Sequence, residues 1–80
     1  MLFAKMNILI TGGASGLGEA ITRKLAQDPE NMIYFTFNKS GENAKRIQST
    51  LPNTMPIKCD FGNVIELKSL TDSIKKLDID

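Results

Sequence analysis

Short apolar segments alternate along the chain with longer segments in which apolar residues recur every three or four positions. Residues 7–10 read Asn-Ile-Leu-Ile and end in a glycine-containing turn, which is typical of a buried strand. From Ser15 onward the pattern changes to that of a half-buried helix, which Asp28 and Pro29 end. The apolar positions of this helix are Leu17, Ile21 and Leu25.

The same alternation is repeated twice more. Residues 32–37 are rich in aromatic and β-branched side chains and predict a second strand. A second helix carries Ala44, Ile47 and Leu51, and the following Pro52 stops it because proline lacks the amide and clashes with the preceding turn. Residues 55–59 predict a third strand. Asn63 and Glu66 resemble a capping box, and a third helix follows with apolar positions at Val64, Leu67, Leu70, Ile74 and Leu77.

Three strand–helix units in strict alternation predict an α/β fold with parallel strands, because a helix is the usual connection between neighbouring parallel strands. This pattern is the N-terminal half of a Rossmann-type doubly wound parallel sheet. We find neither a repeat nor a linker, so residues 1–80 are expected to form a single domain.

Composition narrows the classes of partner. Ten Lys and Arg against nine Asp and Glu leave a net charge of +1, which argues against nucleic acid or a membrane surface as a partner. The single cysteine, Cys59, cannot close an internal disulfide, and residues 1–6 are too short in apolar residues for a signal peptide, so a cytoplasmic location is expected. The chain has no histidine, which excludes histidine-based triads and two-histidine metal sites.

The turn between the first strand and the first helix is the strongest candidate for chemistry. In doubly wound folds this turn and the helix N-terminus hold a pyrophosphate through free amides and the positive end of the helix dipole. Gly12 allows a turn closed to other residues, Gly16 allows close approach of a phosphate, and Gly18 allows the helix to pack on the strand. The alternative is a tight turn whose glycines serve packing alone.

The segment 11–18 reads T-G-x-x-x-G-x-G and differs from the general G-x-G-x-x-G fingerprint, because Ile21 stands where its last glycine would be. It resembles the short-chain dehydrogenase/reductase family in its common form, and Cys59-Asp60 after the third strand adds a second match. The resemblance implies that Gly12, Gly16 and Gly18 line the pyrophosphate of a dinucleotide and that Ser15 lies close to it. Thr11 and Leu17 are also expected to belong to the cofactor-binding residues.

The end of the second strand bears on which dinucleotide is bound. NAD-binding folds place an acidic residue roughly 20 residues after the glycine turn, where it meets the ribose hydroxyls. Here the stretch is Asn38-Lys39-Ser40, which has no acid and offers groups suited to a 2′-phosphate. NADP(H) is therefore favoured over NAD(H). The alternatives are a solvated loop lysine for Lys39 and a helix N-cap for Ser40.

After the third strand, the resemblance implies that Asp60 reaches the adenine amino group and that the backbone of Phe61 adds a contact. The alternative for Asp60 is local turn or capping chemistry. Cys59 is interpreted as a small strand residue that packs inward, since only Lys58 lies close to it as a basic residue.

The family's catalytic residues have no match in this sequence. The resemblance implies hydride transfer between the nicotinamide and a carbonyl or alcohol, assisted by a Tyr with a Lys four residues later; here Asn38 stands four residues after the sole tyrosine, Tyr34. We expect a chain truncated before strand four, with residues 77–80 beginning that strand, and inactive alone. The alternative is a non-catalytic NADP-binding or interaction module. The open edge of the first strand would allow self-association or pairing with a complementing chain.

Overall fold

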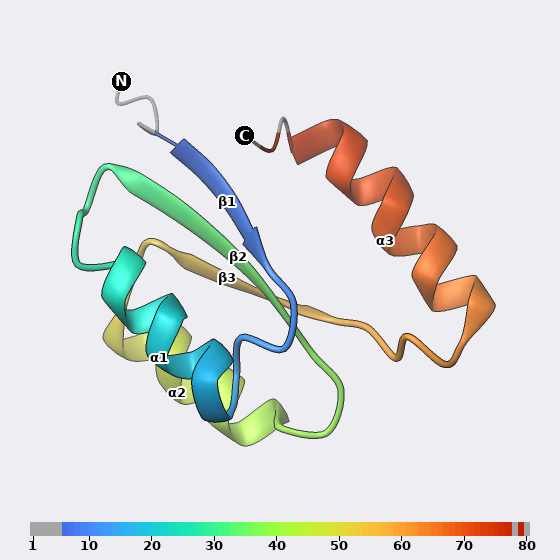
Figure 1. Cartoon of the computed structure of the whole chain (residues 1–80), viewed down its shortest axis with the longest axis horizontal. Helices are drawn as coiled ribbons and strands as arrows, with labels where there is room; N and C mark the ends of the chain where they lie inside the picture. The colour runs from blue at the N-terminus through green and yellow to red at the C-terminus, as the bar shows by residue number, and fades with distance from the viewer. Residues whose placement is uncertain (1–5, 78, 80) are drawn as a thin grey trace.

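The computed structural model describes residues 6–77 and 79, so the expectation for residues 1–5 lies outside the described residues. Strands and helices alternate in the predicted order (Figure 1). The elements are β1 (Met6–Ile10), α1 (Gly16–Leu25), β2 (Asn31–Phe37), α2 (Gly41–Thr50), β3 (Thr54–Lys58) and α3 (Val64–Leu77). The predicted α/β class and the three βα units are confirmed, with boundaries that differ from the expected ones by few residues.

The three strands form one parallel sheet in the order β1-β2-β3. Ile8 of β1 is paired with Ile33 of β2, and Ile33 is paired in turn with Thr54 of β3. The middle strand is the most buried of the three, because it has a neighbour on each side: Ile33 and Phe35 are fully buried. Among the described residues β1 pairs with β2 alone, so β1 forms one edge of the sheet, as expected.

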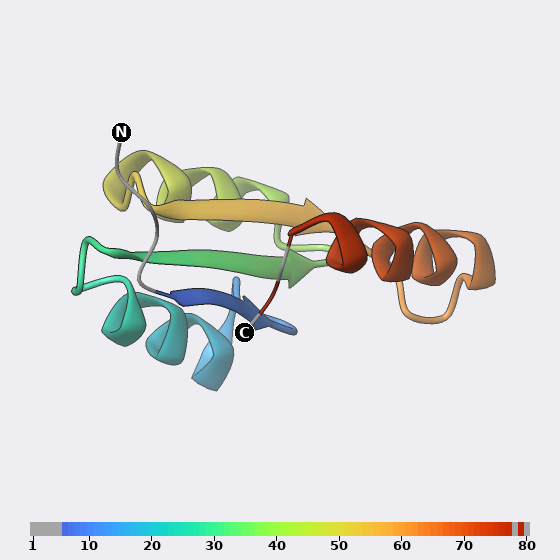
Figure 2. The same cartoon turned by 90° about the horizontal axis from the view of Figure 1, so that it is seen from above.

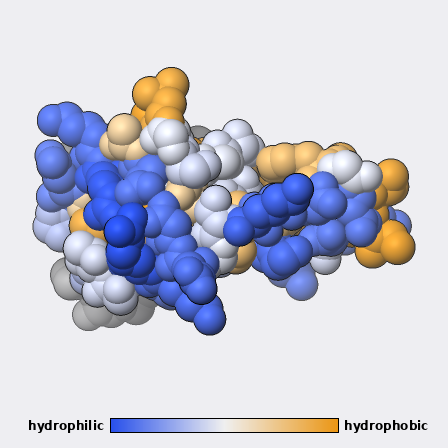
Figure 3. Space-filling view, turned by 90° about the horizontal axis from the view of Figure 1, so that it is seen from below, coloured by the Kyte–Doolittle hydropathy of each residue, from blue (hydrophilic) through white to orange (hydrophobic). Residues whose placement is uncertain are grey.

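Helices α1 and α2 cover one face of the sheet, as Figures 1 and 2 show from two directions. The core between these helices and β2 contains Ala14, Phe35, Ala44 and Ile47. Ile10, Phe37 and Leu51 pack against it from the margins. The outer surface of the two helices is mainly hydrophilic (Figure 3). This packing fixes the start of α1 relative to the end of β2, which is where the candidate site lies.

Helix α3 lies on the other side of the sheet and extends beyond the carboxyl ends of the strands (Figures 1 and 2). Its one fully covered apolar residue is Leu70, which lines a hollow together with Ile57 of β3. At its start, Val64 and Ile65 are 79% and 81% exposed. The helix was predicted from its periodicity, but much of its apolar stripe faces solvent.

Two details at the ends of α3 differ from expectation. Asn63 does cap the helix, since its Oδ1 accepts from the amides of Ile65 (3.0 Å) and Glu66 (3.3 Å). The reciprocal half of the capping box was wrong: Glu66 Oε1 accepts from the amide of Asp60 instead, because the Asn63 amide donates to the Asp60 carbonyl. The expected start of a fourth strand at Leu77 was also wrong. Leu77 is the last residue of α3, Ile79 lies outside any strand, and residues 78 and 80 are outside the described residues.

Within the described ranges 6–77 and 79, no helix is both long enough and apolar enough to cross a membrane.

Candidate cofactor site

The glycine turn between β1 and α1 has the backbone that its glycines predict. Gly12 and Gly16 have φ angles of 67° and 55°, in the left-handed region that favours glycine. Gly18 serves close packing, because a Cβ there would lie 2.7 Å from the Gly12 carbonyl carbon and closer still to its oxygen. Gly18 therefore lets the helix pack on the turn itself, whereas its predicted packing on the strand stays a prediction.

The turn is fastened to β2 by Thr36, a residue that sequence reasoning missed. The Gly12 amide donates to Thr36 Oγ1 at 3.0 Å, and the Gly13 amide donates to the Thr36 carbonyl at 3.0 Å. Gly13 has no room for a side chain either, since a Cβ would meet Thr22 Oγ1 at 2.7 Å. Thr36 is an ordinary threonine in a predicted strand, so only the pairing of β1 with β2 could have indicated its role.

The N-terminus of α1 offers unpaired backbone donors. Ser15 occupies the N-cap position in an extended conformation, and its side chain makes no capping hydrogen bond. The first helical amide with a backbone acceptor is that of Glu19, which donates to the Ser15 carbonyl at 3.2 Å. Within residues 6–77 and 79 the structure gives no acceptor to the amides of Gly16, Leu17 and Gly18. Such amides and the helix dipole together suit an anion.

Two adjoining hollows open beside this turn, at the carboxyl ends of the strands. One, of about 280 Å³, lies between the glycine turn and the β2–α2 loop; the other, of about 260 Å³, lies between β2 and the loop after β3. They share Gly12, Thr36, Phe37 and Asn38. Together they bring seven predicted site residues to one place: Gly12, Ser15, Asn38, Lys39, Ser40, Asp60 and Phe61. Thr11, Gly16, Leu17 and Gly18 do not line them, and Leu17 is 77% exposed.

The loop after β3 shows the local turn interpretation of Asp60, whereas its contact with adenine stays a prediction. Its Oδ1 accepts from the Gly62 amide at 2.9 Å, which is the local turn chemistry expected of an aspartate. Asp60 also lines the second hollow with Phe61, whose side chain is 48% exposed. A turn that holds one carboxylate oxygen leaves the other for a ligand.

Cys59 lies beneath the same hollow as a buried free thiol. Burial raises its pKa, and the charges of Glu66 and Asp60 raise it further, while Lys58 acts in the opposite sense. The thiol Sγ lies 3.7 Å from the Glu66 carbonyl, to which it donates. The expectation of an inward-packing residue is confirmed, and the environment disfavours the reactive thiolate.

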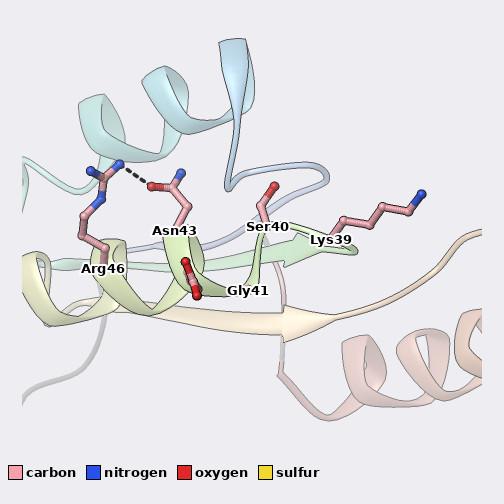
Figure 4. Close-up of a pocket in the computed structure, with 6 residues that line it drawn as sticks. Lys39, Ser40, Gly41, Asn43 and Arg46 are labelled. Carbon is pink, nitrogen blue, oxygen red and sulfur yellow. Dashed lines mark hydrogen bonds between the residues drawn. The ribbon is translucent and has the colours of Figure 1, made fainter.

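A third and larger hollow, of about 730 Å³, lies along the first turns of α2. It is lined by Lys39, Ser40, Gly41, Glu42, Asn43 and Arg46. Ser40 holds the N-cap position of α2 but makes no capping hydrogen bond, so its hydroxyl is not used by the helix. Figure 4 shows Lys39 extending away from α2, whereas Asn43 and Arg46 point towards α1. The basic groups therefore flank the glycine turn.

The described part of the chain, residues 6–77 and 79, holds no group of three or more metal-ligating side chains.

Comparison with known proteins gives a family and a fold. The sequence profile described as short chain dehydrogenase matches residues 6–79. No curated protein sequence matches the chain. Among solved structures, a short chain dehydrogenase/reductase family protein aligns with a TM-score of 0.74 and 19% identity, over 91% of this chain and 31% of that one. A variant of a Serratia marcescens short-chain dehydrogenase/reductase aligns with a TM-score of 0.74 and 21% identity, over 96% of this chain and 33% of that one. The chain thus spans about a third of the length of these structures.

Proposed function

Because the chain belongs to the short chain dehydrogenase family, we propose that it is the nucleotide-binding portion of an oxidoreductase and holds the pyrophosphate and adenine side of NADP(H). One observation carries this proposal: the glycine turn, as far as the N-cap residue Ser15 of α1, and the loops after β2 and β3 line two adjoining hollows. When bound, the nicotinamide cofactor supplies the hydride. The proposed residues bind and orient it, and the transfer to a carbonyl or alcohol belongs to the complete enzyme in the cytoplasm.

Each predicted site residue has a role in the proposed site. Gly12, Ser15 and Gly16 to Gly18 present the turn and the helix N-terminus to the pyrophosphate, with Thr11 beside them. Asp60 and Phe61 line the hollow that suits the adenine. Both hollows also contain Asn38, which lies between these two positions.

The preference for NADP(H) rests on the β2–α2 loop. Lys39 and Ser40 line both the hollow beside the turn and the larger one along α2. An exposed lysine and a hydroxyl that caps no helix suit a phosphate on the ribose. Glu42 also lines the larger hollow and opposes an anion there, so we assign the 2′-phosphate to the Lys39 and Ser40 side.

The test is titration of the chain with NADPH and NADH, followed by nucleotide fluorescence. We expect saturable binding that favours NADPH. Lys39→Ala should weaken NADPH binding roughly fivefold, as expected for an exposed charge contact of about 1 kcal/mol, and should leave NADH binding unchanged. Lys68→Ala removes the same charge on the exposed face of α3 and is the matched control. Absence of saturation with either nucleotide would overturn the proposal.

A second candidate function is pairing with another chain through β1. The observation that favours it is the edge position of β1, together with a row of apolar residues that the strand register places on the sheet face away from α1 and α2. The register places Leu9 on that face beside Tyr34 and Met55. This candidate predicts concentration-dependent association in light scattering, lost in Leu9→Lys and kept in Val64→Lys. A monomer at every concentration would refute it.

A further inference from the structure

A chain of hydrogen bonds joins α1, α2 and the glycine turn outside the residues assigned above. Asn43 Nδ2 donates to the Ala14 carbonyl and to Glu19 Oε1, the latter at 2.6 Å. Asn43 Oδ1 accepts from Arg46 Nη2, as Figure 4 shows. Glu19 Oε2 accepts from Arg23 Nε at 2.8 Å. Asn43 is the one residue of α2 in this network that reaches the backbone of the glycine turn.

We propose that Asn43 is a positioning residue for the cofactor site: by holding the Ala14 carbonyl towards α2 it turns the Ser15 amide away from α2 and fixes the entry into α1. This inference rests on the function proposed above. The Ala14–Ser15 peptide is trans, so its N–H points opposite to its C=O. Ala14 itself is buried with Phe35 and Ala44, so its side chain is already fixed by packing. What the bond from Asn43 orients is the plane of the Ala14–Ser15 peptide.

The chemistry of the asparagine side chain fits this position closely. Its amide nitrogen has two hydrogens, and the structure gives one to Ala14 and the other to Glu19. Its oxygen accepts from Arg46. Aspartate has the same shape but no donor, and it would face the Ala14 carbonyl and the Glu19 carboxylate with a negative charge. Alanine would leave the turn without its anchor on α2.

The carboxylate of Glu19, which accepts from Asn43, forms an ion pair with Arg23 and is also attracted by the charge of Arg46. Glu19 lies in the first turn of α1, next to the amides that we assign to the pyrophosphate. The hydrogen bond from Arg23 lowers the pKa of Glu19, and the bond from Asn43 lowers it further. Arg23 and Arg46 therefore surround the carboxylate from both helices. Asn43 keeps Glu19 turned towards α2, which is a second way in which it orients this end of α1.

The experiment compares NADPH with adenosine 2′-monophosphate, which shares the 2′-phosphate and adenine with NADPH but lacks the pyrophosphate and the nicotinamide riboside beyond it. NMR titrations measure the affinity of both ligands, even where binding is weak. They also report on the resonance of the Ser15 amide directly. The variants are Asn43→Asp and Asn43→Ala, the second because alanine is the best helix former and keeps α2 intact. The matched control is Gln48→Ala, which removes an exposed amide from the same helix. The Gln48 amide contacts Met55 Sδ at 4.0 Å.

We expect both Asn43 variants to bind NADPH roughly tenfold more weakly, which corresponds to about 1.4 kcal/mol, while adenosine 2′-monophosphate binds within twofold of the unmodified chain. The Ser15 amide resonance should shift in the Asn43 variants and stay in Gln48→Ala. Equal losses for both ligands, or unchanged NADPH binding, would overturn the positioning role while leaving the proposed function in place. Absence of NADPH binding by the unmodified chain would instead overturn the proposed function, and the inference with it.

Discussion

Replacing Gly18 by alanine tests how closely α1 must approach the glycine turn. The added Cβ would lie 2.7 Å from the Gly12 carbonyl carbon and 3.2 Å from Gly13 Cα. The Gly12 carbonyl oxygen would lie closer still, so the carbonyl group would have to retreat by more than the roughly 0.7 Å that separates the carbon from the 3.4 Å of an ordinary contact. All these atoms belong to the backbone, so no side-chain rotation can relieve the overlap.

The expected cost follows from two opposing effects. Alanine favours a helix over glycine by about 1 kcal/mol. Overpacking costs about 1–3 kcal/mol, and a clash between backbone atoms belongs at the upper end of that range. We therefore expect Gly18→Ala to lower the free energy of unfolding by about 2 kcal/mol, which for a domain of this size lowers the thermal midpoint by roughly 10 °C.

The assay is thermal unfolding followed by circular dichroism, with Gly41→Ala as the control. Gly41 is the first residue of α2, and a Cβ there would lie 3.6 Å from Phe37 Cε2, an ordinary contact. The control should unfold at or above the midpoint of the unmodified chain because alanine favours the helix. A Gly18→Ala variant as stable as Gly41→Ala would refute the argument that α1 packs directly on the turn.

Three further predictions concern the surroundings of the site. The pKa of Glu19 is lowered from its ordinary value of 4.5, so its contribution to stability is present above pH 4.5 and is lost as the pH falls through the lower folded pKa. Glu19→Gln should therefore be less stable than the unmodified chain at pH 7 and equally stable in acid. Thermal midpoints measured across pH would show this. The raised pKa of Cys59 predicts slow labelling by iodoacetamide at pH 7 and rapid labelling once urea unfolds the chain; rapid labelling of the folded chain would contradict its burial. Asn53→Ala should lower the free energy of unfolding by about 1–3 kcal/mol in urea titration, because three backbone carbonyls lose the Asn53 Nδ2 donor, those of Ala26, Asp28 and Asn31; an unchanged urea midpoint would show that water replaces it.

Local patterns in the sequence were sufficient for the order of elements and for the glycine turn. The period of the apolar residues distinguishes the strand at 32–37 from the helix that carries Ala44 and Ile47, because strands and helices expose side chains with different spacing. The positive φ angle of Gly12 follows in the same way from residue type, since glycine adopts it readily, whereas the positive φ angle of Gly16 was not predicted.

Contacts between distant segments could not be predicted in this way. The bond from the Gly12 amide to Thr36 joins residues 24 positions apart, and the bond from Asn43 to Ala14 joins residues 29 positions apart. Neither threonine nor asparagine carries a local signal for such a partner, because the contact exists only after β1 pairs with β2 and α2 packs on the core. The position of α3 was missed for the same reason: periodicity predicts a helix but does not specify what covers it.

These long-range contacts divide the proposed site into two parts that are held in place by different elements of the fold. Within residues 6–77 and 79, the glycine turn is held by Thr36 of β2 and Asn43 of α2, and by the packing of Gly18 on Gly12. All of these anchors come from the first two βα units. The loop that carries Asp60 is held by its own turn and by Glu66 at the start of α3, a helix whose first residues are largely exposed. The part that we propose for the pyrophosphate is therefore preorganised by the core, whereas the part that we propose for the adenine depends on how firmly α3 is held against β3.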